Sequence, residues 1–550
     1  MRRLLLTLLL AGTTSAQTTW YVDCANPSCP GKGIPSDPFC SIQDAIRSAS
    51  DGDTISVASC TYLENIDFLG KKITVSSQSG PQSTTIDGNA AGPVVSFQMG
   101  ETSASILDGF TLTNGSACNG GGVFCFNTSP MIVNTTIVGN QAQGLPPCGT
   151  GGGIAFGGFA SASLIDSRVQ GNTASYGGGV HAYGSPSIVS STITGNNATI
   201  GAGVYFVVGL GATIEDSTIS GNTALYYGGG LEMNQSTITI RSSTISGNTA
   251  GAGGGGIDQF LVSDLTLENS VVAGNTTAAP GGAGIHTYSP IPGQKLTITN
   301  SNFSGNTSAT SGAALYSRPA GSGGTSFTIR NTIFWGDSPS ELAIGIGGDQ
   351  VSLEHSNIQG GYPGTGNIAS DPLFVDAAQD DFRLQCASPC IAAGTPTPPG
   401  SLPAFDHSGL DDRVLGTIDI GADECGLDWS LVGTPIAGGP PVHFQATAPL
   451  DLGRASAEVL ISRGDGGLSL PAAGGRLLGL DHDGALSFWC SLPAATRSVV
   501  LANCTGAATA PVSVPAGVAV GTQIHYAGMA WDPATGRVRS LSETRSFQVQ

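Results

Sequence analysis

The sequence contains few charged side chains and very few basic ones. Lys and Arg number 20 among 550 residues, against 39 Asp and Glu, so the formal net charge is −19. Binding to nucleic acid depends on basic patches that neutralise phosphates, and this balance argues against such a partner. The same acidity disfavours polyanionic sugars, unless a cation such as Ca²⁺ bridges the charges.

Long apolar runs are also missing. Residues 4–10 form an apolar run that is too short to span a bilayer, and nothing downstream reaches the needed length. Arg2 and Arg3 precede this run and small residues 14–16 follow it, which is typical of a secretory signal cleaved before Gln17. We therefore predict an exported protein, secreted or at the cell surface, without a transmembrane segment.

The common signatures of catalytic and metal sites are absent from the sequence. It has no G-x-S-x-G, no H-E-x-x-H, no phosphate loop and no C-x-x-C pair with zinc spacing. In an exported chain, the 12 cysteines predict disulfides. The sequence leaves their connectivity open, and candidate bridges join cysteines that are close in sequence. They are Cys40 with Cys60, Cys386 with Cys390, and Cys490 with Cys504.

Glycine, in contrast, is abundant, and it belongs to a repeat between Cys118 and Asp337. One copy reads T-I-E-D-S-T-I-S-G-N-T-A-L-Y-Y-G-G-G-L-E-M-N and starts at Thr213. A Gly-Asn step recurs every 24 to 32 residues, at Asn140, Asn172, Asn196, Asn222, Asn248, Asn275 and Asn306. Self-similarity at this period predicts a solenoid.

The short runs within each copy alternate apolar and polar residues, with β-branched residues at most of the apolar sites. This period of two predicts strands, and 82 glycines would make helices costly. Three short strands per copy predict one coil of a parallel β-helix, in which each coil pairs with the next and no coil is stable alone.

The segment before the repeat, residues 17–117, predicts an N-terminal cap and the first coils. Ile42, Ala45 and Ile46 recur at helical spacing behind Ser41, which is a candidate N-cap. A short amphipathic helix here would cover the open end of the apolar core, where an exposed strand edge would invite aggregation.

Two stretches resemble known families. The first stretch is similar to the N-terminal entry of right-handed β-helix proteins of the pectate lyase-like superfamily. It reads D-P-F-C-S-I-Q-D-A-I…D-G-D-T-I-S-V…K-K-I-T-V-S-S. The repeats, I-x-G-N followed by G-G-G and an aliphatic residue, resemble those of polymorphic outer-membrane proteins, which are passenger-type surface proteins. The resemblance covers residues 20–425 and implies an all-β, right-handed, single-stranded parallel β-helix. It implies no single activity, because this scaffold hosts lyases, hydrolases, esterases and non-catalytic adhesins.

The motifs of the superfamily's enzymes are missing from the chain. We find no G-H-G or R-I-K as in polygalacturonases and no W-x-D-H as in pectate lyases. Residues 61–64 are similar to part of the G-x-Y-x-E element of pectin methylesterases, but Cys60 replaces the glycine and the partner motifs are absent. The sequence therefore does not establish catalysis.

Residues directly after each glycine triplet differ between copies and form the candidate functional face. Alternate residues of a strand point to opposite faces, and the inward sites, such as Val204 and Phe206, are mostly apolar. The first outward column is Phe124, Ala155, His181, Tyr205, Glu232, Asp258, His286 and Tyr316. The second is Phe126, Gly157, Tyr183, Val207, Asn234, Phe260, Tyr288 and Arg318.

The outward columns combine acid–base groups with aromatic rings. Glu232 and Asp258 on adjacent coils, flanked by His181 and His286, are the candidate catalytic residues. Neighbouring carboxylates raise one of their pKa values, and a separation of about 5 Å suits a retaining glycosidase or a shared Ca²⁺. Aromatic rings stack on sugars, so the candidate substrate-binding residues are Tyr183, Tyr205, Phe260, Tyr288, Tyr316 and the adjacent Arg318. Such residues also stabilise exposed strands without any ligand.

Another column occupies one turn of each copy. It comprises Asn134, Asp166, Ser190, Asp216, Ser242, Asn269, Asn300 and Asn331. Asn, Asp and Ser bond the local backbone, and Asn and Asp tolerate the left-handed conformation, so we predict a structural role. The Gly-Asn steps and glycine triplets are expected to serve similar turns.

Beyond the repeat coils at 118–337, residues 338–425 predict the last coils and a closing segment. An acidic cluster there could hold Ca²⁺ or pair with Arg413 to lock the cap: Asp406, Asp411, Asp412, Asp419 and Glu424. From residue 426 the repeat vanishes, and alternating runs between Pro and Gly turns predict a small β-sandwich over 426–550.

Three functions remain open. The first is a surface-associated monomer that binds polysaccharide or a cell-surface glycan through the outward columns. The second is a polysaccharide lyase or glycoside hydrolase that uses Glu232, Asp258 and a flanking histidine. The third is an adhesin-like structural passenger. No cofactor is expected except Ca²⁺.

Overall fold

The computed structural model describes most of the chain up to residue 423. The described residues are 17–144, 147–309, 312–318, 324–345, 347–385, 387–395, 407 and 418–423, and the backbone of the strands beyond residue 427. The predicted signal at 1–16 and the predicted Cys490–Cys504 bridge lie outside them. Within them, no helix is long and apolar enough to cross a membrane.

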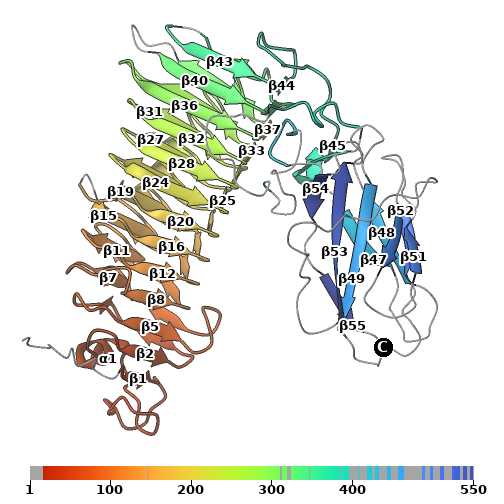
Figure 1. The fold of residues 1–550 in the computed structure, drawn as a ribbon. Coiled ribbons are helices and arrows are strands. Elements are labelled where there is room, and N and C mark those ends of the chain that lie inside the picture. Colours follow the sequence, from red (N-terminus) through yellow and green to blue (C-terminus); the bar gives the residue numbers. More distant parts are fainter. Residues whose placement is uncertain are drawn as a thin grey trace, which may run out of the picture. The chain divides into compact units, whose positions relative to one another are not determined.

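Residues 17–192 and 193–423 belong to two compact units, and each consists of coils of parallel β-strands (Figure 1). A repeat coil contributes one short strand to each of four sheets, which we number 1 to 4 from the strand after the glycine triplet. The prediction of three strands per coil is wrong. The Asn-Thr-Ala segment, expected to be a turn, pairs with its neighbours and forms sheet 4.

In the first unit, the sheets hold the following strands in pairing order. Sheet 1 contains β4 (Ile66–Asp67), β7 (Val95–Phe97), β11 (Val123–Phe126), β15 (Ile154–Ala160) and β19 (Val180–Gly184). Sheet 2 contains β1 (Thr19–Val22), β2 (Thr54–Val57), β5 (Thr74–Ser77), β8 (Ile106–Asp108), β12 (Met131–Val133), β16 (Ser163–Ile165) and β20 (Ser187–Val189). Sheet 3 contains β3 (Thr61–Leu63), β6 (Thr85–Asp87), β9 (Thr111–Thr113), β13 (Thr136–Val138) and β17 (Arg168–Gln170). Sheet 4 contains β10 (Ser116–Ala117), β14 (Gln141–Ala142) and β18 (Thr173–Tyr176).

The second unit repeats this arrangement after β21 (Thr192–Thr194). Sheet 1 contains β23 (Val204–Val207), β27 (Leu231–Asn234), β31 (Ile257–Phe260), β35 (Ile285–Tyr288), β39 (Leu315–Arg318) and β42 (Leu342–Ala343). Sheet 2 contains β24 (Leu210–Glu215), β28 (Thr237–Arg241), β32 (Asp264–Glu268), β36 (Gln294–Thr299), β40 (Thr325–Arg330) and β43 (Gln350–Glu354). Sheet 3 contains β25 (Thr218–Ser220), β29 (Thr244–Ser246), β33 (Val271–Ala273), β37 (Asn302–Ser304), β41 (Ile333–Phe334) and β44 (Asn357–Ile358). Sheet 4 contains β22 (Asn197–Ile200), β26 (Thr223–Tyr227), β30 (Thr249–Ala250), β34 (Thr276–Thr277) and β38 (Thr307–Ser308).

The predicted cap helix is confirmed as α1 (Ile42–Ser48). Ser41 is the N-cap, its hydroxyl accepts from the Asp44 N–H, and the apolar face of the helix is buried. At the other end, the Lys71 ammonium donates to the main-chain oxygens of Ile46, Arg47 and Ala49 at 2.6–2.8 Å. A cation at these unpaired carbonyls stabilises the C-terminus of the helix.

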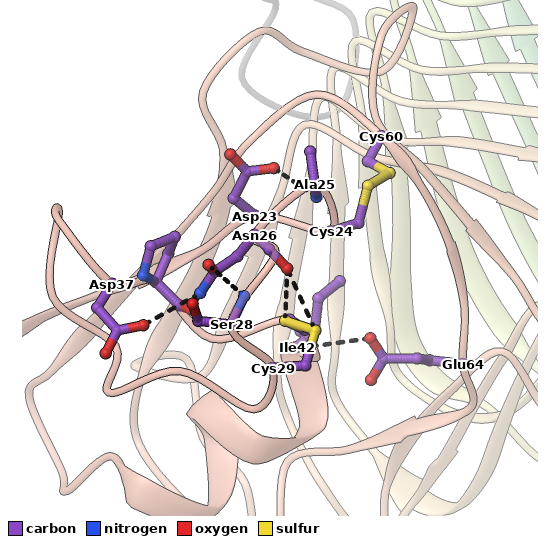
Figure 2. The surroundings of a disulfide bond; sticks show 12 residues. Asp23, Cys24, Ala25, Asn26, Ser28, Cys29, Asp37, Ile42, Cys60 and Glu64 are labelled. Atoms are coloured by element: carbon purple, nitrogen blue, oxygen red, sulfur yellow. Dashed lines mark hydrogen bonds between the residues drawn. A yellow bond between two sulfur atoms is a disulfide. The ribbon is translucent and has the colours of Figure 1, made fainter.

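Disulfides fix the entry loop, but not in the predicted pairing. Cys24 bonds to Cys60 and Cys29 to Cys40, so the prediction of Cys40–Cys60 is wrong (Figure 2). Cys24–Cys60 joins the residues just after β1 to those just before β3, and Cys29–Cys40 closes the loop before α1. Sequence separation does not reveal which of these sites lie close in space. A third bridge joins Cys118 and Cys148. Cys390 is a free, buried thiol, so the predicted Cys386–Cys390 bridge is not formed.

The asparagines of the Gly-Asn steps form a ladder inside the coils and serve the turns there, as predicted. They are at most 1% exposed. Typically, the main-chain N–H and the Nδ2 of one Asn both donate to Oδ1 of the next, as between Asn248 and Asn275 at 3.0 Å each. Nδ2 also donates to a main-chain carbonyl of the preceding coil, such as Ile219 O at 2.9 Å for Asn248. The ladder therefore satisfies backbone groups that the turn would otherwise leave buried and unpaired.

The other turn column behaves as predicted. All eight residues from Asn134 to Asn331 have φ between 44° and 56°, in the left-handed region that Asn and Asp tolerate. A Ser or Thr follows each of them, and its hydroxyl accepts from the main-chain N–H of the preceding coil. An example is Ser243 Oγ, 3.1 Å from the Ser217 N.

The closing segment packs on the outer face of sheet 3 in the second unit. β45 (Phe374–Asp376) and β46 (Asp381–Leu384) form an antiparallel pair, and the 3-10 turn η1 (Ala377–Gln379) connects them. Phe382 and Ala422 are buried against Val271 and Ala273. Of the predicted acidic cluster, Asp419 is buried and its Oδ1 accepts from the Ala392 N–H. Its other members and Arg413 lie outside the described residues.

Beyond residue 427 the backbone forms antiparallel strands. β47 (Asp428–Val432), β48 (Val442–Thr447) and β52 (Ala508–Val512) form one sheet. β49 (Ser456–Arg463), β53 (Gln523–Asp532), β54 (Arg537–Leu541) and β55 (Arg545–Gln548) form a second, and β50 (Leu486–Trp489) pairs with β51 (Thr496–Val499). These strands agree with an all-β segment, and its packing as a sandwich stays a prediction.

Candidate functional site

The outer face of sheet 1 carries the candidate residues in the predicted register. In the second unit, adjacent strands pair Tyr205 with Glu232, Glu232 with Asp258, Asp258 with His286 and His286 with Tyr316. The second column, Val207, Asn234, Phe260, Tyr288 and Arg318, is paired in the same way. Neighbours within a column are therefore separated by about 4.8 Å, the spacing of paired strands.

The acidic part of the first column is buried, although its residues point outward as predicted. Glu232, Asp258 and His286 are 5%, 2% and 4% exposed. These three members of the candidate functional face are therefore covered rather than exposed.

The glycine corners explain this burial. Gly228 and Gly253 have φ of 63° and 65° and lie directly over the column. A Cβ on Gly228 would lie 2.7 Å from Cβ of Glu232. A Cβ on Gly253 would overlap the Asp258 carboxylate and lie 2.7 Å from the Tyr227 ring. The absence of side chains lets the corner backbone cover the column, and Tyr227 extends the cover.

Asp258 and His286 form the best-defined polar contact of the site. His286 Nδ1 lies 2.9 Å from Oδ2 of Asp258, which also accepts from the Gly254 N–H at 2.9 Å. The imidazole stacks on Tyr316, with ring centroids 5.7 Å apart. The carboxylate and the Tyr316 ring together fix the orientation of the imidazole, as in sites where a histidine transfers protons.

Glu232 is a buried acid beside this pair. Its Oε2 has no hydrogen-bond partner. Burial, and secondarily the charge of Asp258, raises the pKa of Glu232 well above its usual range. Glu232 therefore binds its proton more tightly than an exposed glutamate does. Two neighbouring carboxyls in different environments are the arrangement from which acid and base roles arise.

His181 and Tyr183 lie on β19 of the first unit, where both are partly exposed. Desolvation lowers the pKa of His181 to about 4, so the imidazole is neutral at physiological pH. Tyr183 packs edge-on against Phe159, whose side chain is 78% exposed. Their predicted roles beside the residues of the second unit stay predictions.

The second column of the second unit is a partly exposed, ordered strip. Phe260 and Tyr288 stack with centroids 5.7 Å apart and planes within 9°. The Arg318 guanidinium lies 4.9 Å from the centre of the Tyr288 ring, a cation–π contact. Asn234 Nδ2 donates to the Tyr205 hydroxyl at 3.5 Å. We refer to Asn234, Phe260, Tyr288 and Arg318 as the aromatic strip.

Two exposed tyrosines were missed in the sequence. Tyr226 and Tyr227 end β26 and are 50% and 39% exposed. They precede the glycine triplet, whereas the prediction considered only residues after it. Their signal was present, because paired aromatics replace the small residues found at this position in most other copies.

A further small cavity lies away from sheet 1, where the closing segment meets sheet 3. It has a volume of about 160 Å³ and is lined in part by Thr244, Phe382, Arg383 and His407. Arg383 pairs with Asp381 at 2.7 Å, and His407 Nδ1 lies 3.0 Å from the Asn269 carbonyl. The first contact lies within β46, and the second ties residue 407 to the coils.

The residues present do not fit the calcium site considered at Glu232 and Asp258. Among the described residues, no three His, Cys, Asp or Glu side chains converge as metal ligands. Ca²⁺ takes six to eight oxygens, whereas Glu232 and Asp258 supply at most four and Oδ2 of Asp258 already accepts two hydrogen bonds.

Glu64, the esterase-like glutamate of residues 61–64, has a structural role. Its carboxylate accepts from the Ser41 hydroxyl and from the N–H groups of Ile42 and Gln43 at 2.8–3.0 Å. It therefore caps α1, beside the entry disulfides (Figure 2).

Comparison with known proteins supports the fold. The family described as right handed beta helix region matches residues 152–334, less than half of the chain. Among solved structures, the crystal structure of pectate lyase Pel9A is similar, with 15% identity and a TM-score of 0.43, covering 74% of this chain and 97% of that chain. No curated protein matches the sequence. The four sheets of parallel strands, together with the family match, identify the coils as a right-handed parallel β-helix.

Proposed function

We propose that this protein binds a polysaccharide along the outer face of sheet 1, through the aromatic strip. The observation that carries the proposal is the ordered stack of Phe260, Tyr288 and Arg318, which is partly exposed and in register. Because stacking already fixes these side chains, a ligand would lose little free energy in ordering them.

The chemistry of the strip suits a sugar chain. The rings offer apolar contact, and Asn234 and Arg318 offer hydrogen-bond donors at its two ends. Tyr226 and Tyr227 add exposed ring area at the neighbouring corner. With a net charge of −19, a neutral polysaccharide is a better partner than a polyanionic one. Three disulfides agree with an exported protein at an oxidising location.

A panel of neutral and acidic polysaccharides in affinity gel electrophoresis tests this proposal. We expect retardation by at least one neutral polymer, and weaker retardation for Tyr288→Ala. The matched control is Leu210→Ala, which removes a 75% exposed apolar side chain from sheet 2. Equal losses in both variants would contradict a role of the strip.

A second candidate function is polysaccharide cleavage by a lyase or hydrolase. The observation that favours it is the buried Glu232, whose pKa is raised by burial, beside the Asp258–His286 pair. Glu232 would act as the acid, and Asp258 or His286 as the base. Since all three are at most 5% exposed, a substrate could reach them only if the Tyr226–Gly228 corner moved. Cleavage products lost in Glu232→Gln would support this function, whereas binding without products favours the first.

The adhesin-like passenger is the remaining candidate. It predicts no retardation by any polysaccharide in the same panel.

A further inference from the structure

The ladder of buried asparagines ends in two acids. In the repeat coils, Oδ1 of each Asn typically accepts from the N–H and the Nδ2 of the Asn before it. At the last step, Asn306 donates both groups to Oδ1 of Asp337, at 2.6 and 2.7 Å. Asp337 N–H then donates to Oε1 of Glu341 at 3.2 Å. Glu341 thus occupies the position that the next Asn would take.

The remaining oxygens of this pair have no donor. Asp337 and Glu341 are 7% and 4% exposed, and Oδ2 of Asp337 and Oε2 of Glu341 have no hydrogen-bond partner. Oδ2 occupies the place where an asparagine rung has its Nδ2, which typically donates to the next rung, as from Asn275 to Asn306. Two ionised carboxylates here would place unpaired anionic oxygens together in a buried site, which is strongly unfavourable.

We propose that Asp337 is a neutral carboxylic acid whose Oδ2–H donates to the Glu341 carboxylate, so that one bound proton closes the ladder and locks the last coil. A protonated carboxyl has the same shape as a carboxamide and supplies the donor that Nδ2 supplies elsewhere. The lock acts on β42, because the main-chain oxygen of Glu341 accepts from the Ala314 and Leu315 N–H groups of the preceding coil.

The electrostatics agree with this assignment. Burial and the contact with Glu341 raise the pKa of Asp337 well above its usual range, although the Asn306 donors lower it. Burial also raises the pKa of Glu341, while its contact with Asp337 opposes the rise. Among the described residues, the charged group that acts on each of these two carboxyls is the other member of the pair. The neutral groups facing them are the amide of Asn306 and the Gly336 N–H, which donates to Gln359.

The consequence is a pH-sensitive coil. The folded state holds a proton that the unfolded chain releases near pH 4, the ordinary pKa of an Asp carboxyl. The stabilisation is therefore complete below that pH and declines as the pH rises toward the folded pKa of Asp337. In this pH range, one bound proton changes the equilibrium constant for local unfolding of the last coil about tenfold per pH unit. The proposal does not depend on polysaccharide binding. The last coil is nevertheless next to the aromatic strip, because β42 pairs with β39, which carries Arg318.

Infrared spectroscopy detects the proton directly. At neutral pH, the difference spectrum between the wild-type protein and Asp337→Asn should show the C=O stretch of a buried, protonated carboxylic acid. Glu341→Gln should lose the same band, because a carboxamide can donate to Oδ2 and let Asp337 ionise. Glu354→Gln, on neighbouring β43, should keep it. Absence of this band from the difference spectrum between the wild-type protein and Asp337→Asn would overturn the proposal. The buried carboxyl of Glu232 is the same in both proteins, so its contribution cancels in the difference.

Hydrogen exchange measures the consequence. We expect the protection of residues 335–343, corrected for the intrinsic exchange rate, to fall with rising pH in the wild-type protein and to stay level in Asp337→Asn. The variant should become the better protected form at alkaline pH. The same pH dependence in both proteins would contradict the lock.

Discussion

Nδ1 of His286 lies 2.9 Å from Oδ2 of Asp258, and both side chains are buried although they point away from the core of the β-helix. The glycine corners make this possible. They cover an outward column with backbone, and so convert a row of surface positions into an enclosed polar site beside the exposed aromatic strip.

The first prediction concerns this cover. Gly253→Ala should destabilise the protein by about 1–3 kcal/mol more than Gly247→Ala. Both positions have φ near 60°, so both variants carry the same left-handed strain of about 1–2 kcal/mol. Only at Gly253 would the new methyl group meet the Asp258 carboxylate and the Tyr227 ring. Denaturant unfolding of the two variants measures the difference in the free energy of unfolding. Equal losses of stability would show that a methyl group at Gly253 meets no steric conflict with Asp258 or Tyr227.

The second prediction concerns the asparagine ladder. Asn248→Ala should cost about 2–5 kcal/mol, because it leaves the Asn222 N–H and the Ile219 carbonyl buried without partners. Asn197→Ala, at the exposed site directly after the ladder residue Asn196, should cost less than about 0.5 kcal/mol. Chemical denaturation compares them. A ladder variant as mild as the control would mean that the stacked amides contribute little.

The third prediction separates structure from chemistry at the N-terminus. Glu64→Ala should destabilise the cap by about 1–2 kcal/mol, since two helix N–H groups and the Ser41 hydroxyl lose their acceptor. Glu64→Gln retains an acceptor and should lose less. Hydrogen exchange of residues 41–49 reports the effect. Polysaccharide binding should be unchanged in both variants, and its loss with an intact cap would assign Glu64 to a ligand site.

The sequence predicts those parts of this structure that depend on local periodicity. Alternation identified Val204 and Phe206 as inward and Glu232 as outward, and the left-handed turn column follows from residue type alone. The repeat also gave the correct register between coils, because equivalent positions in consecutive copies pair.

Other features depend on how the chain closes in space. The burial of Glu232 and Asp258 arises from the corner backbone that folds over them. The spacing of residues in the sequence does not reveal how closely this backbone approaches the two side chains. The inward direction of Asn248 depends on how sharply the Gly-Asn turn bends. The pairing of Cys24 with Cys60 depends on which strand ends meet. The replacement of Asn by Asp337 at the end of the ladder is visible in the sequence, but its meaning requires Glu341, which only the fold places beside it.

Polysaccharide binding by the aromatic strip is the central claim, and affinity electrophoresis across the polysaccharide panel tests it most directly. The wild-type protein should bind a neutral polysaccharide, and Tyr288→Ala should bind it about tenfold more weakly, the equivalent of about 1.4 kcal/mol, while Leu210→Ala binds normally. Undiminished binding by Tyr288→Ala, or no binding to any polymer of the panel, would contradict the account.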